Sequence, residues 1–343
     1  MQRKNVFILI LIGVIILAAA TFFIIKLAGN TAVVYEDPPT PDVTYSDSMN
    51  EIEEQVSQLR GLAIEESIPR RLMSTDELRQ VILNDFLEDY NAEDEERDIA
   101  VMNLFGLLPA DFKLHDFYQD LYAEQIAGYY DSEEKEMFVI SDSGFGGMER
   151  STYAHEFVHT LQDEHFDFNG TLGYTDDACQ EDSEGCMALQ ALIEGDAVLT
   201  EQLWFQEFGT QEDMQDLQDF ATTYESPVYD SAPDALKESL TFPYLYGSQF
   251  VQTLYAQGGY EAIDAAFSTT NPVSSEQILH PAMYPGDVPS NPILPDLQTP
   301  LGQDWVEIEK DTLGEWYVYL VLAKAYDPQF RLFDSVALDA AEG

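Results

Sequence analysis

The sequence is poor in basic residues, and this excludes one large class of function. Only 15 Lys and Arg residues stand against 64 Asp and Glu residues in 343, which gives a formal net charge of −49. A phosphate backbone requires a basic surface, so we expect no nucleic-acid partner. The chain has only two cysteines, too few for a disulfide-rich scaffold or a Cys₄ zinc module. Its 45% content of hydrophobic residues also excludes disorder throughout the chain.

The N-terminus carries a long uncharged apolar run, from Val6 to Ile25. About 20 residues at about 1.5 Å per residue span a hydrocarbon core of about 30 Å as a helix. We therefore predict a single transmembrane anchor over residues 5–26. The alternative is a cleaved signal peptide with its small-residue site at Ala18–Ala20, which would make the protein secreted. Because the run continues past those alanines, it exceeds a typical signal-peptide core and favours the anchor.

The charges beside this run set its orientation. Arg3 and Lys4 precede it, and beyond Lys26 the next charges are acidic. The positive-inside rule then keeps residues 1–4 in the cytoplasm and places the chain beyond residue 26 on the outer side of the cell membrane. The acidity of the exported part is typical of a solvated surface that resists aggregation. Adaptation to high salt and binding of Ca²⁺ are additional explanations that the sequence leaves open.

The chain beyond the anchor is predicted to divide into four parts. They are an acidic, proline-containing linker (27–50), a helical N-terminal part (51–125), a central part (126–208) and a helical C-terminal part (209–343). We expect related sequences to continue beyond the last of these. Two apolar stretches, Ala127–Asp131 and Met137–Ile140, flank a charged tip and predict a β-hairpin. Helical spacing elsewhere predicts an α+β fold that is mostly helical.

Cys179 and Cys186 flank six residues in the central part. Outside the cytoplasm, such a pair is expected to form a disulfide. Closing a loop of this size would stabilise the fold by about 2–3 kcal/mol through chain entropy.

The central part also holds the motif His155-Glu156-Phe157-Val158-His159, an H-E-x-x-H. On a helix, residues four apart lie on one face, so the two imidazoles can share one Zn²⁺ ion. Glu156 lies on the adjoining flank, within reach of a metal-activated water as a general base. The apolar spacing of Tyr153, Phe157 and Leu161 supports a helix from about residue 149 to 165.

Two residues compete for the position of third zinc ligand. His165 lies ten residues after His155, as in the metzincin pattern, but Gln162 stands where that pattern requires a glycine for a sharp turn. Without the turn the helix continues and carries His165 away from the metal face. Glu194 lies in an apolar second helix over about 184–208, where a carboxylate is costly unless it is paired or metal-bound. We therefore favour Glu194, with Gly195 allowing this helix to approach the first one.

These segments resemble a known group of enzymes. Ala154–His165 followed by Ala191–Ala197 is similar to the gluzincin-type metallopeptidases. With Ala127–Asp131 before them, they resemble more closely an uncharacterised bacterial group of predicted membrane-anchored or secreted zinc peptidases. The resemblance implies a zincin-like α+β core with His155, His159 and Glu194 as zinc ligands and Glu156 as general base. It covers about residues 60–343.

One position departs from the gluzincin pattern. Many gluzincins have an aspartate four residues after the glutamate ligand, where this chain has Val198. Asp196 points away on a regular helix, so the support for the zinc histidines is expected from elsewhere.

The predicted activity is zinc-dependent hydrolysis of peptide bonds in peptide or protein substrates, on the outer side of the membrane. His280 is the candidate donor to the oxyanion, and the alternatives are Tyr129, Tyr130, Tyr246 and Tyr284. By analogy with zincins, the strand at 136–141 is expected to be an edge strand that pairs with the substrate. The alternative function is an inactive, membrane-tethered zincin that binds peptides or an envelope protein.

Overall fold

A computed structural model gives the fold of this chain. It describes residues 11–14, 45–64, 67–82, 87, 90–142, 144–290, 295, 298–302, 304, 305, 307 and 310–342. The described part is mostly helical with one small sheet, which confirms the α+β class.

The sheet has the strand order β1-β3-β4-β2. Strands β3 (Ile126–Asp131) and β4 (Glu136–Ile140) form the predicted antiparallel hairpin. Strand β2 (Arg70–Met73) lies parallel to β4, and β1 (Leu11–Val14) lies antiparallel to β3. The hairpin therefore forms the centre of the sheet.

Two predictions about strands are wrong. Strand β4 is not an edge strand, because β3 pairs with one side of it and β2 with the other. The part predicted to be helical at 51–125 contains β2, whose short sequence Arg-Arg-Leu-Met has no apolar alternation. Its strand conformation comes from tertiary pairing with β4 rather than from local preference.

Most of the predicted anchor, 5–26, lies outside the described residues. Leu11–Val14 is the described exception, and it forms a strand rather than the predicted helix. Among the described residues, no helix is both long enough and apolar enough to span a bilayer. The linker predicted at 27–50 ends earlier, since α2 (Ser46–Arg60) begins within it.

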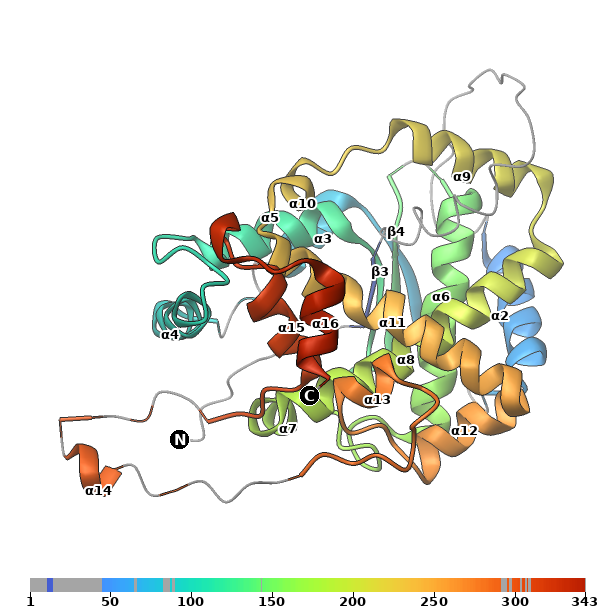
Figure 1. The fold of residues 1–343 in the computed structure, drawn as a ribbon. Coiled ribbons are helices and arrows are strands. Elements are labelled where there is room, and N and C mark those ends of the chain that lie inside the picture. Colours follow the sequence, from blue (N-terminus) through green and yellow to red (C-terminus); the bar gives the residue numbers. More distant parts are fainter. Residues whose placement is uncertain are drawn as a thin grey trace.

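The helices surround this sheet (Figure 1). Besides α2 they are, in chain order, α3 (Thr75–Val81), α4 (Ala92–Leu104), α5 (Leu114–Gln125), α6 (Gly147–Phe166), α7 (Asp176–Glu181), α8 (Ser183–Phe208), α9 (Gln211–Thr223), α10 (Pro227–Ser231), α11 (Asp234–Gly258), α12 (Tyr260–Ser268), α13 (Ser275–Leu279), α14 (Gln298–Leu301), α15 (Glu315–Ala323), the 3₁₀ turn η2 (Pro328–Phe330) and α16 (Asp334–Ala341).

Helix α6 is the centre of the molecule. It packs against β3 and β4 on one side and against α8, α2 and α9 on others, and Figure 1 shows it standing beside the strands. Its predicted apolar stripe of Tyr153, Phe157 and Leu161 is at most 1% exposed. The helix ends where Asp167 adopts a left-handed conformation with φ of 52°. The helix predicted at about 149–165 is therefore confirmed.

Helix α8 is also buried along its middle, and α11 crosses it closely. A Cβ atom added at Gly195 of α8 would lie 2.3 Å from the carbonyl oxygen of Gly247 in α11. One added at Gly247 would lie 2.1 Å from the carbonyl oxygen of Ala191. Gly195 therefore allows close approach to α11, and the prediction that it faces the His155 helix is wrong. A single sequence gives the need for a small residue but not its partner.

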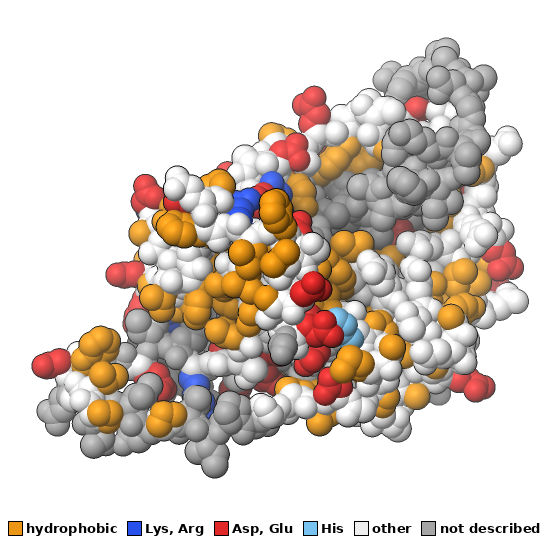
Figure 2. Space-filling view, viewed as in Figure 1, with side chains coloured by type: hydrophobic (Ala, Val, Ile, Leu, Met, Phe, Trp, Pro, Cys, Tyr) orange, Lys and Arg blue, Asp and Glu red, His pale blue; other side chains and the backbone are white. Residues whose placement is uncertain are grey.

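The predicted disulfide between Cys179 and Cys186 is confirmed, and it ties α7 to the start of α8. Figure 2 shows acidic side chains spread between apolar ones over one face of the molecule, with basic side chains in few places. This face agrees with the overall acidity of the chain.

Candidate metal centre

Two helices bring the three predicted ligands together. His155 and His159 lie one turn apart on α6, and Glu194 lies at the middle of α8. Oε2 of Glu194 is 3.2 Å from Nε2 of His155 and 3.5 Å from Nε2 of His159. All three residues are at most 1% exposed. They form a buried group that could hold a metal ion.

The spacing of these atoms fits a tetrahedral ion. Ligands at about 2.0–2.1 Å around zinc lie roughly 3.3–3.4 Å from one another. The two distances from the Glu194 oxygen, 3.2 Å and 3.5 Å, bracket that value.

Each candidate ligand has an outer partner on the atom that does not face the group. Nδ1 of His155 is 3.2 Å from Oε2 of Glu201, and Nδ1 of His159 is 2.9 Å from Oε1 of Gln162. The phenol of Tyr244 donates to Oε1 of Glu194 at 3.1 Å. Metal-binding histidines almost always have such partners on the second ring nitrogen, because these fix the tautomer and the ring orientation. The arrangement leaves Nε2, Nε2 and Oε2 facing one another.

The group combines one buried carboxylate with two buried imidazoles. Among the described ion pairs, Glu194 contacts only His155 and His159. Burial lowers the pKa of His155, but its hydrogen bonds to Glu194 and Glu201 outweigh this and raise the pKa well above its ordinary value. Nε2 of His159 is buried and has no hydrogen-bond partner among the described residues. A buried imidazole nitrogen without a hydrogen bond is unfavourable unless another group, such as a metal ion, contacts it.

Glu156 lies beside the group and is fully buried. Burial first, and then the charges of Glu194 and Glu156, raise the pKa of the Tyr244 phenol well above its ordinary value. Glu156, Glu194 and Tyr244 therefore share one region of low dielectric. Gly128 of β3 permits this packing, because a Cβ there would lie 3.1 Å from Cγ of Glu156.

His165 is placed away from the group, as the sequence indicated. Helix α6 continues past Gln162 to Phe166 without a turn. Nε2 of His165 lies 2.8 Å from the carbonyl oxygen of Ala63, in an exposed position. Glu194 is therefore the third member of the group.

The contacts that the structure shows for the predicted oxyanion donors are with other residues. Nε2 of His280 lies 3.0 Å from both carboxylate oxygens of Glu315. Of the tyrosines, Tyr130 donates to Asp163, Tyr284 to Thr270, Tyr129 stacks on Phe138, and Tyr246 packs on Phe242 and Trp316. The role of His280 stays a prediction.

Sequence reasoning missed Glu201, Gln162 and Tyr244. Glu201 follows Glu194 by seven residues, two helical turns, so the two lie on one face of α8. That spacing was the available signal for Glu201. Tyr244 comes from α11, and no local pattern links it to the motif. Asp196 is not the partner of either histidine ring, whose Nδ1 atoms face Glu201 and Gln162, and its carboxylate accepts from the amide of Gln162 at 2.9 Å.

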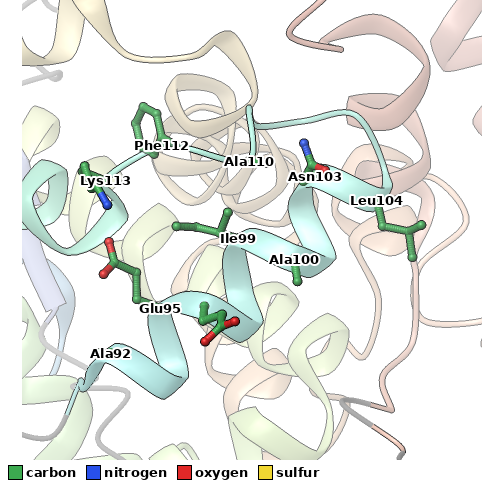
Figure 3. A pocket seen from close by; sticks show the side chains of 10 residues that line it. Ala92, Glu95, Ile99, Ala100, Asn103, Leu104, Ala110, Phe112 and Lys113 are labelled. Carbon is green, nitrogen blue, oxygen red and sulfur yellow. The ribbon is translucent and has the colours of Figure 1, made fainter. Parts of the chain in front are cut away.

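A surface hollow of about 500 Å³ lies apart from this group, between α4 and the start of α5. Figure 3 shows that Glu95, Ile99, Phe112 and Lys113 line it. It contains no histidine. Among the described residues, the only group of three or more His, Cys, Asp or Glu able to hold an ion is His155, His159 and Glu194. The prediction of Ca²⁺ binding stays untested.

Comparisons with protein-family models, with curated proteins and with solved structures found no match. The resemblance to gluzincins therefore stays a prediction from the sequence motifs.

Proposed function

We propose that this protein is a zinc-dependent peptidase of the gluzincin type. The observation that carries the proposal is the buried convergence of Nε2 of His155, Nε2 of His159 and Oε2 of Glu194. Two imidazoles with one carboxylate are the donor set of catalytic zinc sites with His₂Glu ligands. The adjacent Glu156 adds the group that hydrolysis needs and that metal binding alone does not.

Each residue of the site has a distinct task in this proposal. His155, His159 and Glu194 would hold the ion, and Glu201, Gln162 and Tyr244 would keep their donor atoms directed at it. A bound zinc ion supplies Lewis acidity, which polarises a substrate carbonyl and lowers the pKa of water. Glu156 would take a proton from water, whose oxygen adds to the substrate carbonyl carbon, and would pass that proton to the amine nitrogen as the C–N bond breaks.

Tyr244 joins His280 as a candidate donor to the oxyanion, a role in which its single hydroxyl hydrogen would turn from Oε1 of Glu194 to the substrate. Its phenol already lies at the site through Glu194, whereas His280 is held by Glu315. Burial raises the pKa of Tyr244 well above its ordinary value, so the phenol keeps its proton and remains a donor at neutral pH.

The closure of the site favours a second candidate. His155, Glu156, His159 and Glu194 are at most 1% exposed, and catalytic zinc sites keep one position open, whereas structural ones are closed. A peptide would reach this site only after part of its cover moves. The second candidate is therefore an inactive zincin-like domain that holds zinc and binds a peptide or an envelope protein.

We also propose that residues 5–26 anchor the chain in the cell membrane, with the site on the outer side. In that state Leu11–Val14 would be part of the membrane helix and would not pair with β3. The support is the apolar run and the charges of Arg3 and Lys4 before it. Cleavage of the segment would instead give a secreted protein.

A peptidase assay on the full chain tests the choice between the two candidates. Glu156→Gln should retain zinc and lose at least about 100-fold of the rate of peptide hydrolysis, the usual range for a general base. Glu164→Gln, at an exposed position of the same helix, should change neither quantity. Zinc binding without hydrolysis in the wild type would favour the binding domain, and full activity in Glu156→Gln would refute the assigned base.

A further inference from the structure

A buried chain of hydrogen bonds leads from His159 to α2. Gln162 lies one turn after His159, and its amide nitrogen donates to Oδ2 of Asp196 at 2.9 Å. Nε of Arg60, the last residue of α2, donates to the same carboxylate oxygen at 3.0 Å. All four side chains are at most 1% exposed. Three helices, α2, α6 and α8, therefore contribute to the position of one imidazole.

The partners of Gln162 fix the orientation of its amide. Its nitrogen lies 3.0 Å from the carbonyl oxygen of Ile193 and 2.9 Å from the carboxylate of Asp196. Both partners accept and cannot donate, so the amide nitrogen must face them. The amide oxygen must then face Nδ1 of His159, which lies 2.9 Å away.

This orientation determines the tautomer of His159. An amide oxygen accepts only, so Nδ1 of His159 must carry the hydrogen. In a neutral imidazole the other nitrogen, Nε2, then holds a lone pair. That atom is buried without a hydrogen bond among the described residues and lies 3.5 Å from Oε2 of Glu194. A lone pair in this place is ready for a metal ion.

Arg60 keeps Asp196 in the acceptor state. Its guanidinium also donates to Asp264 at 2.6 Å and lies 4.5 Å from the centre of the Tyr260 ring. Thr200 donates to the other oxygen of Asp196 at 3.5 Å. A guanidinium only donates, so Oδ2 of Asp196 accepts from Arg60, and the same oxygen accepts from the amide of Gln162.

We propose that Arg60, Asp196 and Gln162 are positioning residues that hold His159 as the Nδ1–H tautomer, with Nε2 directed at the metal. The inference rests on the proposed metal site and adds three residues outside the motif to it. The two histidines differ in the group that faces Nδ1. His155 has the carboxylate of Glu201 there, whereas His159 has the uncharged amide of Gln162. In the chain of hydrogen bonds from His159, the carboxylate of Asp196 comes after the amide of Gln162, and it pairs with Arg60.

The tautomer is measurable without any metal. Long-range ¹⁵N–¹H spectra of the full chain, labelled at histidine and kept at about pH 9, above the ordinary pKa of imidazole, distinguish Nδ1–H from Nε2–H. His159 should show a protonated Nδ1 and an unprotonated Nε2. Gln162→Met keeps the length of the side chain and removes the acceptor, so the ring should shift to Nε2–H. A wild-type Nε2–H tautomer, or no change in Gln162→Met, would overturn the inference.

Zinc affinity, measured by competition with a chromophoric chelator, tests the same chain with the metal present. Gln162→Met should raise the Kd for zinc by roughly 10–100-fold, the usual effect of losing an outer partner. The matched control Gln206→Met, at an exposed position of α8, should leave the Kd unchanged. An unchanged Kd in Gln162→Met would refute the positioning role while the metal site itself stands.

The coupling to Arg60 gives a readout that a merely structural residue would not produce. Arg60→Lys keeps the positive charge and loses the planar guanidinium. With Gln162 intact, it should therefore weaken zinc binding severalfold. In the Gln162→Met background it should have no further effect on the Kd, because Arg60 acts through the amide. Equal effects in both backgrounds would show that Arg60 supports the fold alone. If the wild type binds no zinc, the proposed function fails, and the tautomer measurement still decides the chain of hydrogen bonds.

Discussion

The close contact between α8 and α11 predicts that Gly247→Ala lowers stability. Helix propensity alone would predict a rise, so the sign of the change shows which of the two effects is larger. Alanine is a better helix former than glycine, so Gly247→Ala in an isolated helix would stabilise it by about 1 kcal/mol. In the protein, the added Cβ would lie 2.1 Å from the carbonyl oxygen of Ala191, whereas contacts below 3.0 Å are essentially never seen. The obstructing atom belongs to the backbone and cannot rotate away. The helices must therefore separate by roughly 1 Å at a position where the interior is close-packed.

The magnitude follows from these two terms. Overpacking of a core costs about 1–3 kcal/mol, and occasionally more. A contact with rigid backbone belongs at the upper end of that range, so subtracting the helix-propensity gain leaves a loss of about 2 kcal/mol in the free energy of unfolding. For a large domain this corresponds to a decrease in Tm of roughly 4–8 °C. Glu194 adjoins Gly195 in this contact, so zinc binding should weaken as well.

Thermal and denaturant unfolding of the wild type, Gly247→Ala and Gln249→Ala measure this effect. Gln249 is exposed on the same helix, so its substitution by alanine should change stability by less than about 0.5 kcal/mol. A Gly247→Ala variant that is as stable as the wild type, or more stable, would refute the close helix contact.

Three further predictions concern the surroundings of the site. Glu201→Gln should raise the Kd for zinc by roughly 10–100-fold, while Glu207→Gln, exposed on the same helix, should not; equal values in a chelator competition would exclude Glu201 as an outer partner. Reducing the disulfide should lower the free energy of unfolding by about 2–3 kcal/mol with little change in metal affinity, which denaturant titration and the same competition would measure. At His280 burial lowers the pKa, but Glu315 raises it more, above its ordinary value; the stability from this pair is thus present below about pH 6.5 and lost as pH rises through the folded-state pKa. The difference in unfolding free energy between wild type and His280→Asn should therefore shrink from about pH 6 to pH 9, and a constant difference would contradict this.

The parts of the site that lie close together in sequence could be predicted. The spacing of His155 and His159, with the apolar stripe of Tyr153, Phe157 and Leu161, indicates both the helix and the shared face. Helical periodicity is a local property, and one turn of helix decides which residues meet. The hairpin of β3 and β4 follows in the same way from two apolar stretches around a charged turn.

The parts that depend on tertiary pairing could not be predicted in the same way. Strand β2 forms because its backbone pairs with β4, and its own sequence gives no strand signal. The need for glycine at position 195 was visible, but its contact with Gly247 joins residues of two helices that are distant in sequence. Arg60 meets Asp196 across 136 positions. Such partners are set by how the helices pack, which a single sequence does not contain.

The most direct test of the account is the metal content of the purified full chain. Elemental analysis should find one zinc per chain in the wild type and in His165→Ala, and none in His155→Ala or Glu194→Ala. This is the result expected if His155, His159 and Glu194 form the site. Zinc that is kept in Glu194→Ala and lost in His165→Ala, or a wild type that takes up no zinc after reconstitution, would contradict the account.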